Sequence, residues 1–326
     1  MRRFVSMIMI SGASAITFAV AGVPFNGKKG AALLEAVASS SRPSAVVQRQ
    51  DLNFGMTDEF MGTAVEIKSG ALPDGYEWGC LIPAEWWSNS WEVYGAAVSG
   101  DIYNIVPLCG DVRSYRRDLA PVESVGKPAY SNGLWSAGLT VLYGVETEAY
   151  SPPAALRGEL ARAFMYMAVV YHVATWTERA YMMMDGYAYP GLTDYAIPLL
   201  LDWHRANPPS VHEIAKNERG ERLQGNRNPF VDYPELAEYL WGIHRDEQFV
   251  VDGEPMPLRG VYTLADARID LFSLEVPADA AWTVNGIPVS SDFVVPAELG
   301  VGTHKFAYSS ASTGERGMVM IKVERK

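Results

Sequence analysis

The sequence predicts an α+β protein followed by a small all-β module. Three observations lead to this fold class: two short strand-like runs before residue 110, apolar helical patterns between residues 151 and 242, and alternating strand patterns beyond residue 255. With 326 residues, 48% of them hydrophobic, the chain can bury one large core and part of a second. We therefore expect a leader at 1–21, a main domain at 22–254 and a C-terminal domain at 255–326.

The first residues have the layout of a secretory signal peptide. Arg2 and Arg3 precede an apolar run of small residues, and Ala21 offers the expected cleavage site. The alternative is an uncleaved membrane anchor, because the run from Phe4 to Val23 is just long enough to cross a bilayer. Cleavage predicts a secreted, periplasmic or cell-surface protein with no stable membrane span after processing.

The net charge and the cysteine content limit the kinds of binding site and cross-link that the chain can have. The formal net charge of −11 argues against a protein that coats nucleic acid through its overall charge, so a polyanion site has to be local. Cys80 and Cys109 are the two cysteines of the sequence. In an exported protein we expect them to form a disulfide bridge, and the alternative is two buried free thiols.

The main domain begins with mixed elements. A short helical pattern covers residues 26–41, and the two strand-like runs cover residues 77–87 and 100–110. The segment that begins near Asp111 predicts a helix or a tight polar turn, and Gly138–Tyr150 contains one further strand.

The second half of the main domain predicts four helices, and the C-terminal domain predicts strands. Ser210 and Glu213 have the spacing of a capping box, and Pro234 marks the start of the last helix. Asn285-Gly286 predicts a hairpin in a small immunoglobulin-like β-sandwich. The helical patterns cover residues 151–176, 195–210, 210–225 and 228–242.

Four stretches, in the right order, resemble the secreted endonuclease I family. They are "PAEWW" at 83–87, "GDIYNIVP" at 100–107, "GELARAFMYMAVVY" at 158–171, and the longest, "WHRANPPSVHEIAKNERGERLQGNRNPFVDYPE" at 203–235. The resemblance covers roughly residues 24–245 and implies a ββα-metal nuclease fold with a helical lobe. It does not reach the C-terminal domain.

The same resemblance implies which positions should carry chemistry. In the family a histidine activates water, while the adjacent glutamate and a helix asparagine hold a divalent metal that neutralises charge on the phosphate. Here the glutamate position is Gly79, the histidine position is Cys80, and the asparagine position is Arg113. A second histidine position is Tyr103, and a family arginine aligns with Arg116. The resemblance therefore implies a catalytic centre that lacks the family's base and metal ligands, and we expect no metal or cofactor.

The arginines behind Cys109 predict a second role for this region. Arg113 could clamp a phosphate or carboxylate directly, together with Arg116 and Arg117, so nucleic acid or another anionic ligand is the expected partner. The alternative is a surface ion network with nearby acids. The acids considered for this network are Asp101, Asp111, Asp118 and Glu123.

Further binding candidates are Asn104, Trp86, Trp87 and Arg227. The two tryptophans could instead form a hydrophobic clasp under a loop, and Arg227 could instead hold the turn before the last helix.

Two rebuilt centres are also considered. His204, His212 and Glu213 lie close enough in sequence to suggest a metal site, and Cys80 could act as a nucleophile beside a histidine. Neither has a supporting sequence signature.

The sequence leaves three functional hypotheses. The first is an exported endonuclease I-like protein without catalysis, acting as a binding or surface module. The second is an active nuclease that holds Mg²⁺ or Ca²⁺ through Asn104, Asp101, Glu77 or Asp111. The third is an adhesin or assembly subunit whose C-terminal domain contacts the cell surface or another protein.

Overall fold

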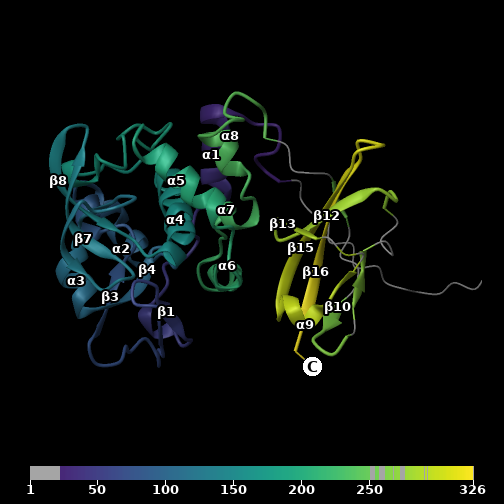
Figure 1. Cartoon of the computed structure of the whole chain (residues 1–326), viewed down its shortest axis with the longest axis horizontal. Coiled ribbons are helices and arrows are strands. Elements are labelled where there is room, and N and C mark those ends of the chain that lie inside the picture. Colours follow the sequence, from purple (N-terminus) through teal and green to yellow (C-terminus); the bar gives the residue numbers. More distant parts are fainter. Residues whose placement is uncertain are drawn as a thin grey trace, which may run out of the picture.

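The protein is described by a computed structural model, shown in Figure 1. The predicted signal peptide at 1–21 lies outside the described residues. No helix of the described part of the chain is both long and apolar enough to cross a bilayer. The description covers residues 23–249, 254–256, 261–266, 268–271, 276–289, 291 and 293–325.

The centre of the main domain is a ββα unit. Strands β3 (Tyr76–Cys80) and β4 (Ile105–Cys109) pair antiparallel, with Gly79 opposite Val106, and helix α3 (Gly110–Arg116) follows β4 without a break. Both predicted strands are present, but each is shorter than its run: the first ends at Cys80 and the second begins at Ile105. The polar segment after Cys109 is a helix. The connection from β3 to β4 holds a 3₁₀ helix, η2 (Ala84–Ser90), and α2 (Trp91–Gly100).

A four-stranded sheet follows α3 in the order β5-β8-β7-β6. The one strand predicted in Gly138–Tyr150 is instead most of a hairpin of two strands. Tyr143 and Gly144 both have positive φ, 52° and 81°, as a tight hairpin turn requires. The strands are β5 (Ala120–Pro121), β6 (Lys127–Ser131), β7 (Ser136–Leu142) and β8 (Val145–Ser151).

The helical lobe surrounds α4 (Arg157–Val170), which is buried along almost its whole length. Ser210 and Glu213 form the predicted capping box of α6. The predicted fourth helix is two short helices, because Asn228 caps the first and Pro234 lies in the break between them. The remaining helices are α1 (Gly30–Ser41), α5 (Ala196–Ala206), α6 (Val211–Gln224), α7 (Pro229–Asp232) and α8 (Leu236–Leu240).

Short elements connect these parts. Strands β1 and β2 form a small antiparallel hairpin before the ββα unit, and three 3₁₀ turns lie in the connections. Their bounds are β1 (Met56–Asp58), β2 (Thr63–Val65), η1 (Arg49–Asp51), η3 (Ala154–Leu156) and η4 (Glu178–Ala180).

The C-terminal strands form a mixed sheet and a two-stranded piece. The sheet order is β10-β16-β15-β12-β13, and both β9 and β10 run parallel to β16. The Asn285-Gly286 hairpin joins β12 to β13 as predicted. The elements are β9 (Glu254–Met256), β10 (Val261–Thr263), β11 (Ile269–Asp270), β12 (Ala280–Val284), β13 (Ile287–Val289), β14 (Phe293–Val294), α9 (Pro296–Leu299), β15 (Gly302–Ser310) and β16 (Arg316–Glu324).

These strands lie beside the helical lobe, next to α6, α7 and α8 in Figure 1. The backbone N–H of Thr303 donates to Glu218 Oε1 at 3.1 Å, and Lys305 Nζ lies 3.7 Å from Glu235 Oε1. Lys305 also lies over the ring of Tyr233, 5.1 Å from its centroid. Met318 of β16 also joins the buried hydrophobic cluster of the main domain, so the contact between the two parts has both polar and apolar members.

Candidate functional site

The family's glutamate position is closed by packing. A Cβ built on Gly79 would overlap the Cδ1 atom of Leu108, whose side chain is buried across the β3–β4 pair. A carboxylate at this position has no room unless Leu108 moves. Strand β3, which should present a metal ligand, therefore presents a glycine, and Leu108 of the partner strand β4 is packed against it.

Cys80 is a protonated thiol at neutral pH. Burial raises the pKa of Cys80 to about 11, although the guanidinium groups of Arg116 and Arg49 oppose the shift. A thiol with this pKa supplies little thiolate for nucleophilic attack or for metal binding. The suggestion that Cys80 acts as a nucleophile gains no support from its surroundings.

The predicted disulfide is wrong, because Cys80 and Cys109 are both free. In the β3–β4 register Cys80 faces Ile105 while Cys109 faces Tyr76, so the two cysteines lie at opposite ends of the pair. Four residues along a strand span about 13 Å, which is beyond the limit of about 7 Å between the Cα atoms of a disulfide. The antiparallel register itself prevents the bridge.

Arg113 is ion-paired on the surface. Its guanidinium contacts Glu77 of β3, and the two side chains are 46% and 64% exposed. The pair connects α3 to β3 at the edge of the family's metal position. No separate cation is needed to neutralise Glu77, and the carboxylate is not available as a metal ligand while the pair persists.

Arg116 does not line a cleft, contrary to the prediction. Its side chain is only 3% exposed, donates to the carbonyl oxygens of Cys80, at 2.7 Å, and Leu81, and lies over the rings of Phe60 and Tyr150. Because these contacts use both terminal nitrogens, Arg116 fixes the end of β3 rather than binding a ligand.

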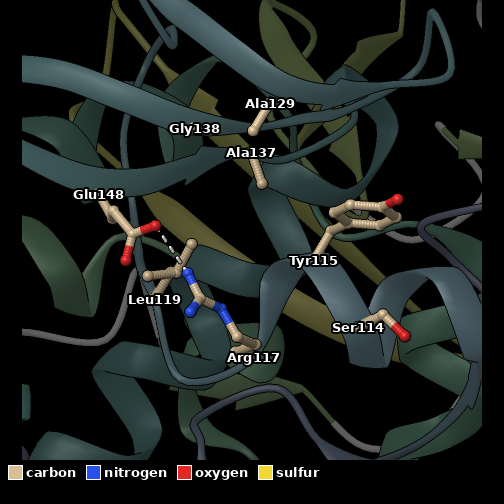
Figure 2. Close-up of a pocket in the computed structure, with 8 residues that line it drawn as sticks. All are labelled: Ser114, Tyr115, Arg117, Leu119, Ala129, Ala137, Gly138 and Glu148. Atoms are coloured by element: carbon tan, nitrogen blue, oxygen red, sulfur yellow. Dashed lines mark ion pairs between the residues drawn. The ribbon is translucent and has the colours of Figure 1, made fainter.

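Arg117 is the arginine of this segment that faces a cavity. It lies 2.9 Å from Glu148 of β8, and both side chains are about half exposed. Figure 2 shows the pair at one side of the cavity and the ring of Tyr115 at the other.

The surface ion network is therefore present, but its partners differ from those considered. Arg113 and Arg117 pair with Glu77 and Glu148. Of the acids weighed from the sequence, Asp118 pairs with Arg179 and Glu123 pairs with Arg157, while Asp101 is buried and Asp111 accepts from Tyr130.

Tyr103 and Asn104 are structural rather than catalytic or ligand-binding, which corrects two predicted site residues. The Tyr103 hydroxyl donates to Asn217 Oδ1 at 2.7 Å, inside the helical lobe. Asn104 is fully buried; its Oδ1 accepts from the N–H of Ile82 at 2.8 Å and its amide donates to the Val98 carbonyl. Both side chains hold the approach to β4.

Asp101 belongs to a buried network of hydroxyl and amide groups. Its carboxylate accepts from Tyr166 at 2.8 Å, Tyr171 at 2.9 Å and Gln224 at 3.1 Å, and burial raises its pKa. Gln224 in turn donates to Asn226, so the network links the segment before β4 to the segment after α6. Asp101 is consequently not placed to hold a metal with Glu77 or Asp111.

The tryptophan candidates are core residues, which rules out the predicted stacking role. Trp86 is fully buried and donates to the carbonyl of Asp118 at 2.9 Å. Trp87 is also fully buried, with its ring 4.0 Å from that of Trp176 and 5.5 Å from that of Tyr171. The hydrophobic clasp, considered as the alternative, is what forms.

Arg227 has the structural arrangement considered for it. Its guanidinium makes two bonds of 2.8 Å to Asp232 and one of 3.0 Å to Glu221. These bonds fix the turn between α6 and α7. The side chain is thereby paired with two protein carboxylates.

No group of three His, Cys, Asp or Glu side chains within the described part of the chain is arranged to hold a metal. Glu213 is engaged by Arg162 in two bonds of 2.6 Å, and Arg162 also contacts His204. Burial, and then the charge of Arg162, lower the pKa of His204 to about 4. The possible metal site at His204, His212 and Glu213 is therefore wrong.

Glu59 is a titratable group that the sequence did not single out. Burial, and then the neighbouring carboxylate of Glu159, raise its pKa to about 7, while Lys216 opposes the shift and Glu213 and Asp58 reinforce it. No local motif marks Glu59, because its neighbours come from α4 and α6. The same holds for Tyr115 and Glu148 at the cavity, which meet only in the fold.

Comparison with protein-family models shows the family to which the chain belongs. The Endonuclease I family model matches residues 33–235, which include the ββα unit and most of the helical lobe. The chain belongs to the endonuclease I family. The match ends before the C-terminal strands.

Curated relatives carry nuclease names and share part of the chain. An extracellular ribonuclease of Bacillus amyloliquefaciens is 27% identical over 168 residues, which cover 48% of this chain and 52% of the relative. An extracellular ribonuclease of Bacillus subtilis (strain 168) is 32% identical over 105 residues, or 29% of this chain and 33% of the relative. A periplasmic deoxyribonuclease of Aeromonas hydrophila is 27% identical over 135 residues, or 41% of this chain and 48% of the relative. The chain thus spans about half the length, or less, of these relatives.

Proposed function

We propose that this protein is an exported member of the endonuclease I family that has lost phosphodiester hydrolysis and acts as a binding module. Export is supported by the extracellular and periplasmic relatives and by the predicted signal peptide. Nucleic acid is the proposed ligand because the relatives are named ribonucleases and deoxyribonucleases.

The observation that carries the loss of catalysis is the packing of Leu108 against Gly79. Metal-assisted hydrolysis needs a cation that neutralises charge on the phosphate and a base that activates water. The position of the first metal ligand is filled by a leucine, and the position of the second carries Arg113, already paired with Glu77. A fixed guanidinium there excludes a divalent cation by charge.

The position of the base gives independent support. With a pKa of about 11, Cys80 is deprotonated in about one molecule in 10,000 at pH 7. The charge of Arg116, which also donates to the Cys80 carbonyl group, opposes the effect of burial without cancelling it. Neither water activation nor coordination of a hard cation suits this group.

We further propose that residues 255–326 form an immunoglobulin-like sandwich that presents the main domain to a surface or a protein partner. The Asn285-Gly286 hairpin and the buried cluster of the C-terminal strands, which includes Trp282 and Phe306, support such a module. The parallel pairing of β9 and β10 with β16 adds strands in an orientation that an all-antiparallel sandwich lacks.

The test is hydrolysis of labelled DNA and RNA by the full chain with Mg²⁺, Mn²⁺ or Ca²⁺, each against an EDTA control. We expect no metal-dependent cleavage. The Arg113→Ala variant tests the alternative of a rearranged centre, because freeing Glu77 should raise the rate if that carboxylate holds a metal. Cleavage by the unaltered chain that EDTA abolishes would overturn the proposal.

A further inference from the structure

A small cavity lies between the end of α3 and the sheet β5-β8-β7-β6. It has a volume of about 110 Å³, and we call it the α3 pocket (Figure 2). Tyr115 and Arg117 come from α3 and its C-cap, Ala129 from β6, Gly138 from β7 and Glu148 from β8. The volume suits a single planar ring system, since sites for larger organic ligands start at about 300 Å³.

The backbone is shaped locally to make the α3 pocket. Strand β6 bulges at Ala129, and a Cβ at Gly138 would overlap the backbone of this bulge, so only glycine permits the close approach. On the opposite side Arg117 has φ 48° and ψ −128°, a conformation that non-glycine residues rarely adopt. These two features set the floor of the pocket and aim the Arg117 side chain at Glu148.

The walls combine the aromatic ring of Tyr115 with adjacent polar groups. The Tyr115 ring stacks on Tyr130, with centroids 4.2 Å apart and planes at 22°, and this contact fixes its orientation. Arg117 and Glu148 lie 2.9 Å apart and are 49% and 56% exposed. Exposed ion pairs of this kind contribute little, so a ligand that offers one acceptor and two donors can replace the pair at small cost.

We propose that the α3 pocket binds an unpaired guanine base of single-stranded nucleic acid, and this rests on the proposed binding function. The Watson–Crick edge of guanine offers two neighbouring N–H donors, which match the two oxygens of Glu148, and the adjacent carbonyl accepts from Arg117. Tyr115 supplies the stacking surface that single-stranded bases use. In a duplex this edge is already paired, so the pocket selects single strands.

The other bases match Glu148 and Arg117 less well than guanine does. Uracil and thymine offer one donor between two acceptors, and cytosine and adenine offer one exocyclic amine beside an acceptor. Each of these would leave one oxygen of Glu148 without a donor. Discrimination therefore depends on the carboxylate, whereas stacking on Tyr115 contributes to all bases alike.

The experiment titrates the full-length protein with guanosine, adenosine, cytidine and uridine in the presence of EDTA, and follows the backbone amide signals of Gly138 and Arg117 by NMR. We expect guanosine to shift these signals at a concentration at least tenfold lower than the other nucleosides. Glu148→Gln should weaken guanosine binding at least tenfold, and Tyr115→Leu should weaken binding of all four nucleosides.

Glu146→Gln is the matched control. Glu146 lies two residues earlier on β8, is ion-paired with Lys127 at 3.0 Å, and does not line the pocket, so this variant should bind guanosine as the unaltered chain does. Equal binding of all nucleosides, no shift at Gly138 and Arg117, or identical shifts with inorganic phosphate alone would each overturn the inference. Because EDTA is present, these results are independent of hydrolysis: metal-dependent cleavage would refute the loss of catalysis and leave the pocket intact.

Discussion

Arg116, which the family resemblance places among the positions expected to carry chemistry, has a structural role in this chain. In this chain its guanidinium is buried, has no carboxylate partner among the ion pairs of the described residues, and binds backbone carbonyl groups at the end of β3. Removing it leaves these buried acceptors without donors, which costs about 1–3 kcal/mol for each group.

We therefore predict that Arg116→Met lowers the free energy of unfolding by about 2–4 kcal/mol, measured by urea denaturation. Arg113→Ala is the matched control on the same helix. Its exposed ion pair with Glu77 should contribute less than about 1 kcal/mol. Similar losses for both variants would contradict the structural role of Arg116.

The thiols give a second prediction at this scale. We expect two free thiols per chain when the protein is denatured without a reducing agent, because the strand register separates Cys80 from Cys109. In the folded Cys109→Ser variant, Cys80 should react slowly with a thiol reagent at pH 8, and the rate should rise steeply as the pH approaches 11. Rapid reaction at pH 8 would contradict the raised pKa.

Glu59 predicts a pH dependence of stability. Because the folded chain holds this proton more tightly than the unfolded chain, the stabilising contribution of Glu59 is complete below its ordinary pKa of 4.5 and is lost as the pH rises to about 7. The carboxylates of Glu159, Glu213 and Asp58 and the ammonium of Lys216 face it.

We expect Glu59→Gln to raise the free energy of unfolding by about 1–3 kcal/mol at pH 8 and to change it little at pH 4. Thermal melts at both values measure the difference. Glu66→Gln, an exposed carboxylate paired with Lys68, is the control and should show no such pH dependence. An equal effect of Glu59→Gln at both pH values would exclude a raised pKa.

At the scale of elements, most helices and strands follow from sequence patterns. The capping box of α6 and the Asn285-Gly286 hairpin follow directly from residues with strong local preferences. The β7–β8 turn at Tyr143-Gly144 was not predicted, because tyrosine rarely adopts a positive φ. The apolar pattern over residues 228–242 predicts one helix, whereas the structure has two short helices, α7 and α8, separated at Pro234.

The candidate site was predictable in position but not in the direction of its side chains. Alignment with the family places Gly79, Cys80 and Arg113 on the ββα unit, where they are found. Tyr103 and Arg116 turn into the protein because of partners elsewhere in the chain, in α6 and at the end of β3. A one-dimensional pattern does not contain those contacts.

Tyr103 makes the packing of α6 testable. A Cβ at Gly220 would overlap the Tyr103 hydroxyl, so Gly220→Ala should destabilise the protein by about 1–3 kcal/mol despite the better helix propensity of alanine. In Gly110→Ala the new Cβ meets no atom within 4 Å, so this helical control should stay within about 1 kcal/mol. Chemical denaturation of both variants decides whether Tyr103 sets the requirement for glycine.

At the scale of the whole molecule, polar side chains of the helical lobe contact the C-terminal strands. The Glu218 carboxylate accepts a hydrogen bond from the backbone N–H of Thr303, and the Glu235 carboxylate lies close to the Lys305 ammonium. Exposed polar contacts of this kind permit relative motion more readily than a large apolar interface, and here Met318 of β16 adds an apolar contact with the main domain.

We predict that the double variant Glu218→Ala/Glu235→Ala accelerates hydrogen exchange at the Thr303 amide at least tenfold. Exchange within α4 should be unchanged, because this helix lies in the core of the main domain. Glu324→Ala removes an exposed pair with Lys322 on β16 and is the control. Equal exchange at Thr303 in all three proteins would show that these contacts do not hold the strands in place.

The leucine packed against Gly79 also bears on the evolutionary path of this chain. Reinstating an acidic side chain at position 79 before Leu108 is trimmed forces two groups into one volume, whereas trimming Leu108 first opens a void in the protein interior. Either order passes through a less stable intermediate. A carboxylate at position 79 and a full-sized side chain at position 108 are therefore coupled, so that a change at one position requires a change at the other.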